Sequence, residues 1–265
     1  MITRRVLLLG LTILVIYTTV SLAGSKDEQG WQPATATWYG PPEGDGSTGG
    51  ACGFGDLVDK VPYKTKVSAG NLPVWKNGKG CGSCYKVKCS EDICSGEAVP
   101  LIITDECPGC STDQVWFDLS GSAFGRMAVP GQADALRNKG KIKVLYERTK
   151  CMYPGWNLAF RVNEGSSEYY FSVLIMYEGG DGDVASVKLK QAGSSTWTEM
   201  QQSWGAIWSL TGVGPIKAPF SLSLTSLSTA KTVTAMDVIP SSWYPTATYT
   251  SSLQLFYFTS NETSF

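Results

Sequence analysis

The chain has 265 residues and a formal net charge of −1. Its length and its 43% hydrophobic residues allow one or two domains with buried cores. It has no run of basic residues, which argues against nucleic acid as a partner. It also has no histidine. This excludes Ser-His-Asp and Cys-His catalysis and histidine-ligated zinc, and it leaves acid–base chemistry to carboxylates.

The first 23 residues have the layout of a secretory signal peptide. Arg4 and Arg5 precede a nearly uninterrupted apolar run at 6–20, and small residues ending at Ala23 suit a cleavage site. A signal anchor that stays uncleaved is the alternative, and no later stretch is long enough to span a bilayer. Cleavage leaves 20 basic against 23 acidic side chains and predicts a secreted, extracellular protein.

Eight cysteines fit this oxidising destination, and their even number would let every thiol pair. They are Cys52, Cys81, Cys84, Cys89, Cys94, Cys107, Cys110 and Cys151. Two Cys-x2-Cys pairs have the spacing of a zinc ribbon, and the second pair also resembles a thiol-exchange motif. Secretion and the loop context favour disulfides over both alternatives, so we expect no metal and no cofactor. The spacing alone does not give the pairing.

Residues 24–150 are predicted to form a disulfide-braced, mostly β domain. Glycine-rich loops such as 40–55 separate short apolar runs such as 99–103. One short helix is predicted after Ser120, whose side chain could cap it, and another at about 131–138.

The texture of the sequence changes after Cys151, and no cysteine follows it. Residues 151–157 are predicted to be a short linker. Seven β-rich stretches broken by turn residues then predict an antiparallel β-sandwich at 158–260, a second domain. The stretches are 158–162, 169–177, 184–190, 207–210, 220–225, 232–238 and 253–258. The tail at 261–265 begins with Asn261, a predicted glycosylation site.

One carboxylate of the first domain lies inside an apolar run. In a strand at 115–120, alternate residues would fill the core while Trp116 and Asp118 share an open face. Asp105 ends another apolar run, so the two carboxylates could line one cleft. In the structural alternative, Asp105 caps a loop and Asp118 accepts backbone hydrogen bonds, and the sequence does not separate the two.

Aromatic residues in both domains offer flat surfaces on which sugar rings stack. The predicted polysaccharide-binding groove consists of Thr37, Trp38, Tyr39, Asp105, Trp116 and Asp118. The predicted binding face of the sandwich consists of Tyr170, Trp204 and Trp208. Trp204 and Trp208 are expected to share one face of a single strand. Core packing is the alternative for each aromatic.

Seven short motifs occur in order over most of the secreted chain. They are ATWYGPP (36–42), GGACGFG (49–55), GCGSCYKVKC (80–89), ITDECPGC (103–110), FDLSGSAFG (117–125), SWGAIW (203–208) and DVIPSSW (237–243). Together they resemble the β-expansins, plant wall-loosening proteins related to grass-pollen group-1 allergens. Seven ordered motifs make a far more specific signal than any one of them.

The resemblance implies a fold, a disulfide pairing and a function. The fold would be all-β, a six-stranded double-psi β-barrel followed by an immunoglobulin-like sandwich that binds polysaccharide. The disulfides would be Cys52–Cys81, Cys84–Cys151 and Cys89–Cys94, with Cys107 and Cys110 paired locally as in vegetative members. The implied protein is a secreted monomer that binds arabinoxylan and cellulose. It would loosen non-covalent contacts between wall polymers without hydrolysis.

The barrel also resembles that of family-45 endoglucanases, inverting cellulases whose acid lies in a His-Phe-Asp motif. Asp118 stands at the position of that acid, and Trp116 replaces the histidine. Inversion needs a second carboxylate about 6.5–9.5 Å away to activate water. The matching place after Tyr39 holds Gly40 and Pro41, so Asp118 is interpreted as a retained acid that binds sugar hydroxyls.

Two alternatives stay open at this stage. A weak inverting endoglucanase or xylanase would use Asp118 as acid and Asp105 or Asp45 as an unconventional base. A wall-binding protein without loosening activity would follow from Trp116 in place of histidine and Ser47 in place of an acidic residue. Trp116 is also expected to desolvate Asp118 and raise its pKa.

Overall fold

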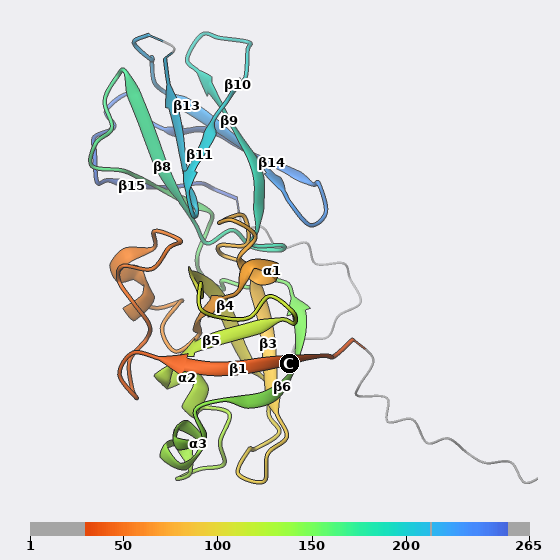
Figure 1. The fold of residues 1–265 in the computed structure, drawn as a ribbon. Helices are drawn as coiled ribbons and strands as arrows, with labels where there is room; N and C mark the ends of the chain where they lie inside the picture. The colour runs from red at the N-terminus through yellow and green to blue at the C-terminus, as the bar shows by residue number, and fades with distance from the viewer. Residues whose placement is uncertain (1–29, 213, 254–265) are drawn as a thin grey trace, which may run out of the picture. The chain divides into compact units, whose positions relative to one another are not determined.

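Six strands close a barrel in the computed structural model, which describes residues 30–212 and 214–253 (Figure 1). Their order is β1-β5-β2-β4-β3-β6, and β6 pairs back onto β1. The pairs β1–β5 and β2–β4 are parallel. The strands are β1 (Gln32–Tyr39), β2 (Val67–Gly70), β3 (Cys84–Cys89), β4 (Val99–Glu106), β5 (Trp116–Ser120) and β6 (Ile142–Thr149). The predicted six-stranded barrel is therefore confirmed.

The side chains of the barrel strands alternate between the core and the outer face. In β5, Phe117 and Leu119 are fully buried, whereas Trp116 and Asp118 are partly exposed. This is the two-residue period of a strand. The residues that the sequence singled out on β5 thus lie on its outer face.

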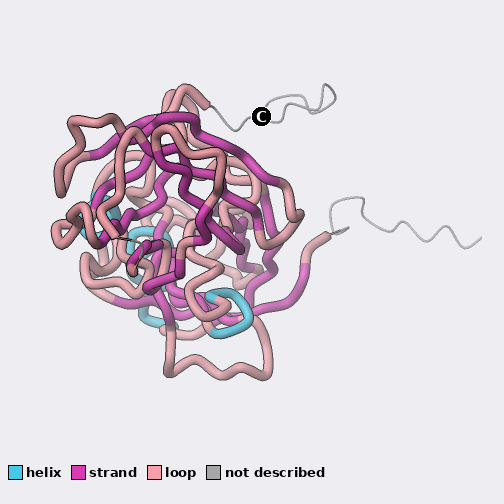
Figure 2. The backbone as a smooth tube through the Cα atoms, turned by 90° about the horizontal axis from the view of Figure 1, so that it is seen from above, coloured by secondary structure: helices cyan, strands magenta, loops and turns pink. Residues whose placement is uncertain are grey.

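Short helical segments join the barrel strands. They are η1 (Gly55–Asp59), α1 (Leu72–Trp75), α2 (Gly121–Gly125) and α3 (Ala133–Lys139). Ser120 caps α2, because its Oγ accepts a hydrogen bond from the Ala123 backbone N–H at 3.3 Å. Strands and loops make up nearly all the rest of the described chain (Figure 2). Within the described ranges, every helix is too short or too polar to cross a bilayer.

Two sheets enclose a second core and confirm the predicted sandwich. Their orders are β10-β9-β13-β14 and β11-β12-β8-β7-β15. Phe171 and Phe220, one from each sheet, meet with ring centroids 5.0 Å apart. The strands are β7 (Ala159–Val162), β8 (Tyr170–Met176), β9 (Val184–Gln191), β10 (Thr198–Glu199), β11 (Gln201–Trp204), β12 (Ile207–Thr211), β13 (Phe220–Ser226), β14 (Thr232–Ile239) and β15 (Thr248–Thr250).

Three strands of the sandwich were not predicted from the sequence. β10 and β11 are short and mostly polar, so they lack the apolar alternation that indicates a strand. β15 pairs with β7 through Tyr249 and Phe160. The last strand was expected at 253–258, of which only Leu253 is described, and it lies outside the strands. The signal peptide and Asn261 lie outside the described residues, and the domain division at 151–157 stays a prediction.

Four disulfides use all eight cysteines, in the pairing that the resemblance implied. They are Cys52–Cys81, Cys84–Cys151, Cys89–Cys94 and Cys107–Cys110. Because every thiol is bonded to another, neither Cys-x2-Cys pair can supply zinc thiolates. The Cys84–Cys151 bond closes a sequence separation of 67 residues. In the chain-entropy model, such a loop contributes about 4 kcal/mol to stability.

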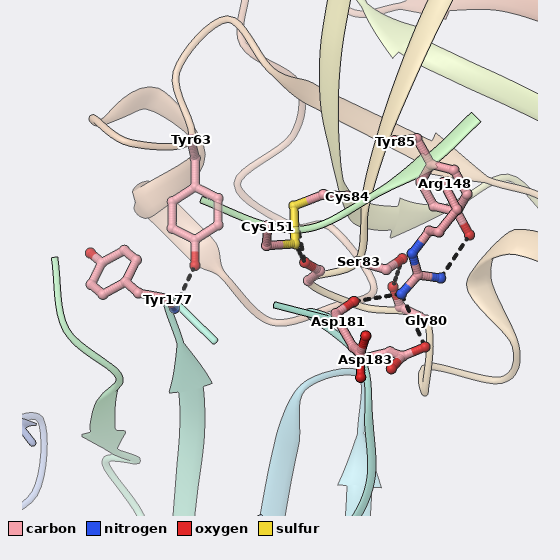
Figure 3. The surroundings of a disulfide bond; sticks show 11 residues. Tyr63, Gly80, Ser83, Cys84, Tyr85, Arg148, Cys151, Tyr177, Asp181 and Asp183 are labelled. Carbon is pink, nitrogen blue, oxygen red and sulfur yellow. Dashed lines mark hydrogen bonds and ion pairs between the residues drawn. A yellow bond between two sulfur atoms is a disulfide. The ribbon is translucent and has the colours of Figure 1, made fainter. Parts of the chain in front are cut away.

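A partly buried ion pair joins the barrel to the sandwich beside the Cys84–Cys151 disulfide (Figure 3). Arg148 of β6 donates to the Asp181 carbonyl oxygen at 2.5 Å and to the Asp183 carboxylate at 3.1 Å. Asp183 is fully buried and accepts two more bonds from the Ser228 hydroxyl and backbone N–H. A buried charge is tolerated when it is paired and hydrogen-bonded in this way.

Glu178 lies in the same region, but its carboxyl is poorly satisfied. Its Oε2 is buried and has no hydrogen-bond partner among the described residues. Burial raises the pKa of Glu178 to about 8, and the charges of Asp181 and Asp183 add to the increase. The Gly182 backbone and Arg148 act in the opposite direction. Glu178 therefore keeps its proton in the folded protein well above its ordinary pKa of 4.5.

This carboxyl makes stability depend on pH. Between its unfolded pKa of 4.5 and its folded pKa of about 8, the folded chain binds a proton that the unfolded chain has released. The stabilisation by this proton is complete below 4.5 and is lost as pH rises to about 8, at up to about 1.4 kcal/mol per pH unit. We expect Glu178→Gln, a neutral mimic, to remove this slope in urea unfolding at pH 5 and 7.5. The control is Glu164→Gln at an exposed position, and equal slopes in the two variants would contradict the assignment.

Candidate functional site

Four paired residues form a row across neighbouring strands of the barrel. Asp105 of β4 pairs with Ala69 of β2, Ala69 pairs with Asp118 of β5, and Asp118 pairs with Thr37 of β1. Paired residues on adjacent strands point to the same side of a sheet. Two strand spacings separate the Cα atoms of Asp105 and Asp118, a distance of about 10 Å. We call these four residues the carboxylate row.

Asp118 is tied to its neighbours on the same face. Its Oδ1 accepts a hydrogen bond from the Thr37 hydroxyl at 2.5 Å. The indole Nε1 of Trp116 donates to the same Thr37 oxygen at 3.0 Å. Burial raises the pKa of Asp118, the bond from Thr37 lowers it, and the nearby charge of Asp105 raises it. The net direction is upward, as the sequence led us to expect.

Asp105 is an anchor for the glycine-rich loop at 49–55. Its Oδ1 accepts hydrogen bonds from the backbone N–H groups of Ala51 at 2.7 Å and Glu106 at 2.8 Å. This oxygen of Asp105 therefore caps a loop, as the structural alternative had it. Asp105 lies in the same row as Asp118, but its Oδ1 is engaged in hydrogen bonds that hold a loop.

Asp45, the other candidate for a base, is also committed to structure. It is buried, and its Oδ1 accepts hydrogen bonds from the Thr65 backbone N–H at 2.8 Å and the Ser122 hydroxyl at 2.6 Å. Ser47, close by, accepts a bond from the Gly49 backbone N–H. These residues shape the loop before β2.

Trp38 and Tyr39 lie on opposite faces of β1, which corrects the expectation of an exposed aromatic pair. Tyr39 points to the same side of β1 as Thr37, two residues before it. Burial raises the pKa of Tyr39, and the charges of Asp105 and Asp118 raise it further. Trp38 pairs with the fully buried Leu119 and packs against the barrel core. Its indole N–H donates to a carbonyl at the end of α3. Successive residues of a strand cannot share a face, so only Tyr39 lies on the same face as the carboxylate row.

Asn71 and Lys141 also lie in this region, although the sequence did not predict either of them as a site residue. Asn71 is fully buried, and its Nδ2 donates to the carbonyl oxygens of Ser111 and Gln114, both at 2.7 Å. Its backbone N–H and its Oδ1 also bond to the main chain of Trp116. The Lys141 ammonium lies 4.1 Å from the Trp116 ring centroid. No local pattern marks either residue, since their partners are distant in the chain.

The loop at 49–55 also contacts the sandwich. The backbone N–H of Ala206 donates to the Cys52 carbonyl oxygen at 3.0 Å. Gly205 permits this approach, because a Cβ there would lie 2.5 Å from the Ala51 oxygen. The Trp204 ring packs beside the loop, 3.1 Å from where a Cβ on Gly53 would be. One loop therefore contacts both the carboxylate row and the turn that follows Trp204.

Trp208 is a core residue, and its assignment to a binding face is wrong. Trp204 is 51% exposed on β11, whereas Trp208 is only 4% exposed on β12. A turn at Gly205 separates the two strands and pairs Trp204 with Ile207, so Trp208 points into the sandwich core. The expected single strand does not exist.

Tyr170 lies on the same outer face as Trp204. It pairs with Thr211, whose side chain points to the same side of β12 as that of Ile207. Ile207 in turn pairs with Trp204. The two aromatics are therefore separated by about 13 Å along the strand direction.

Comparisons with known proteins match both halves of the described fold. A family model described as the expansin C-terminal domain matches residues 158–240. A double-psi barrel model described as lytic transglycolase matches residues 67–146. An expansin of Clavibacter michiganensis has a similar fold at 21% identity, with a TM-score of 0.63 and coverage of 84% of this chain and 96% of its own. A mutant of that protein, solved in complex with cellohexaose, has a TM-score of 0.64.

Plant relatives are much closer in sequence. Expansin-B3 of Arabidopsis thaliana is 55% identical over 224 residues, which covers 84% of each chain. Expansin-B16 of Oryza sativa subsp. japonica is 56% identical over 226 residues, covering 84% of this chain and 83% of that one.

The closed barrel followed by the sandwich is the fold of the expansin class of cell-wall proteins. Within this class, the chain belongs to the β-expansin family. It is a wall-loosening protein that is secreted to the plant cell wall and acts without hydrolysis.

Asn71 should be the main polar support of the strand that carries Trp116. We expect Asn71→Ala to lower the free energy of unfolding by about 2–4 kcal/mol, because it leaves several buried backbone groups unpaired. Urea unfolding followed by tryptophan fluorescence measures this. Asn157→Ala removes one bond, to the Ser251 carbonyl oxygen, and should cost about 1 kcal/mol. Equal losses in the two variants would contradict this role for Asn71.

Proposed function

We propose that the carboxylate row binds a matrix polysaccharide, arabinoxylan, while the outer face with Trp204 and Tyr170 engages cellulose or xylan. Asp118 would accept hydrogen bonds from sugar hydroxyls, since its bond from Thr37 goes to Oδ1 and leaves Oδ2 available. Tyr39 and Trp116 flank it on the same strand faces. A bacterial expansin of this fold in complex with cellohexaose supports a β-linked glucan as a ligand.

The observation that carries this proposal is that the two carboxylates of the row have different hydrogen-bond donors. Asp105 accepts backbone N–H groups, whereas Asp118 accepts a side-chain hydroxyl. An inverting mechanism would need a second carboxylate across from Asp118 that activates a water. Asp105, however, accepts two backbone N–H groups through Oδ1 and holds the loop at 49–55. Among the described residues, the carboxylate that shares the row with Asp118 is thus engaged in holding a loop. This division supports binding in place of bond cleavage.

Loosening would follow from differential affinity. If the protein binds a polysaccharide chain more tightly once that chain is displaced from its neighbours, it shifts the equilibrium toward separation without a covalent step. A surface that runs from Asp118 through the loop at 49–55 to Trp204 would let one molecule hold matrix polymer and cellulose together. We also propose that the protein is of the vegetative type, supported by the Cys107–Cys110 disulfide.

The first test is Asp118→Asn in a creep assay on heat-killed, clamped wall strips. Loss of the charged acceptor should weaken polysaccharide binding roughly tenfold and reduce extension accordingly. Neither the parent protein nor the variant should release reducing ends from xylan or cellulose. Asp113→Asn, an exposed change on the same segment, is the control. Reducing ends released by the parent and not by Asp118→Asn would establish a hydrolase instead.

The second test concerns the sandwich. We expect Trp204→Ala to weaken binding to cellulose roughly tenfold in a pull-down assay, because an exposed indole face is lost. Tyr244→Ala is the matched control, since Tyr244 is 63% exposed and precedes β15 at the opposite edge of the same sheet. Equal binding by the two variants would show that Trp204 is not part of the cellulose-binding face.

A further inference from the structure

Trp116 is held rigidly beside Asp118. Its backbone N–H donates to Asn71 Oδ1 at 3.2 Å, and its carbonyl oxygen accepts from the Asn71 N–H at 3.1 Å. Lys141 covers its ring with the ammonium 4.1 Å from the centroid, a cation–π contact. One face of the indole is thus occupied by a cation. This arrangement suits a fixed support better than a free stacking platform for sugars.

While Asp118 is ionised, the two hydrogen bonds of the Thr37 hydroxyl have only one possible direction. An indole N–H can donate but cannot accept, so the Thr37 oxygen must be the acceptor in its 3.0 Å bond to Trp116. A hydroxyl has a single proton, and that proton is then left for Asp118 Oδ1 at 2.5 Å. The relay runs from Trp116 through Thr37 to Asp118.

We propose that Trp116 is a positioning residue that keeps the Thr37 hydroxyl directed at Asp118 whenever Asp118 is ionised. A histidine in this place would behave differently, because a neutral imidazole can accept the Thr37 proton and an imidazolium cannot. The relay would then change direction near the ordinary histidine pKa of about 6.5. The indole has no such transition. That Asp118 meets a sugar rests on the function proposed above, whereas the relay itself does not.

The consequence is a defined environment for one carboxylate. Asp105 on β4 and Tyr39 on β1 interact electrostatically with Asp118, while Lys141 lies over the Trp116 ring and Lys143 reaches Thr35, the residue paired with Trp116. The bond from Thr37 is the contribution that lowers the pKa of Asp118 against burial and Asp105. If Trp116 orients that bond, its removal should let the hydroxyl rotate and the pKa of Asp118 rise further.

Carboxyl NMR of the full secreted chain, labelled with ¹³C at aspartate, tests this directly. Asp118→Asn identifies the resonance, and the titration of Asp118 is then followed in four variants. We expect an upward shift in Trp116→Phe and a larger one in Thr37→Val. Trp116→His should restore the parent behaviour at low pH and add a second inflection to the Asp118 curve near pH 6.5. Trp38→Phe should change nothing, since its 2.9 Å indole bond lies on the other face of β1.

Two results would overturn the proposal. One is an Asp118 titration that is unchanged in Trp116→Phe but shifted in Thr37→Val, which would show that Thr37 needs no support from the indole. The other is a shift in Trp38→Phe equal to that in Trp116→Phe, which would indicate a general loosening of the barrel. The titration uses no polysaccharide. A failure of the creep and binding tests would therefore leave this result standing, and the reverse also holds.

Discussion

The loop at 49–55 is held from two sides, and the arrangement of the site depends on this constraint. The Asp105 carboxylate of the barrel accepts the Ala51 N–H at 2.7 Å, and the Cys52 carbonyl oxygen accepts the Ala206 N–H from the sandwich at 3.0 Å. Backbone contact this close requires glycine at 205. The carboxylate row and Trp204 are thereby placed at the two sides of one short, anchored segment.

Two aspartates in one row have different tasks because their hydrogen-bond donors differ. Asp105 receives backbone donors and acts through the loop that it holds. Asp118 receives a side-chain hydroxyl on one oxygen, and burial raises its pKa. A hydrolase would need both carboxyls free for a proton and a water. In the described structure, Asp105 is engaged with the loop at 49–55 through Oδ1.

The contact between barrel and sandwich shows two outcomes for a carboxylate taken out of water. Asp183 is fully buried, yet it is paired with Arg148 (Figure 3). It also accepts a hydrogen bond from the Ser228 hydroxyl, so its charge is compensated. Glu178, close by, has no partner for Oε2 within the part of the chain that the structure describes, and burial favours its protonated form. The contact between barrel and sandwich therefore combines an ion pair with a carboxyl group whose charge depends on pH.

The sequence by itself determined features that depend on neighbours in the chain. Alternation at 115–120 placed Trp116 and Asp118 on one outer face, Ser120 marked a helix start, and the seven motifs implied the barrel, the sandwich and the cysteine pairing. Only the tertiary structure decided that Trp38 faces the core, that Trp208 is buried, and that Asn71 and Lys141 support Trp116. Periodicity shows which residues of one strand share a face. It does not show which face is covered, or which distant strand lies alongside and in what register, because these follow from the closure of the sheets.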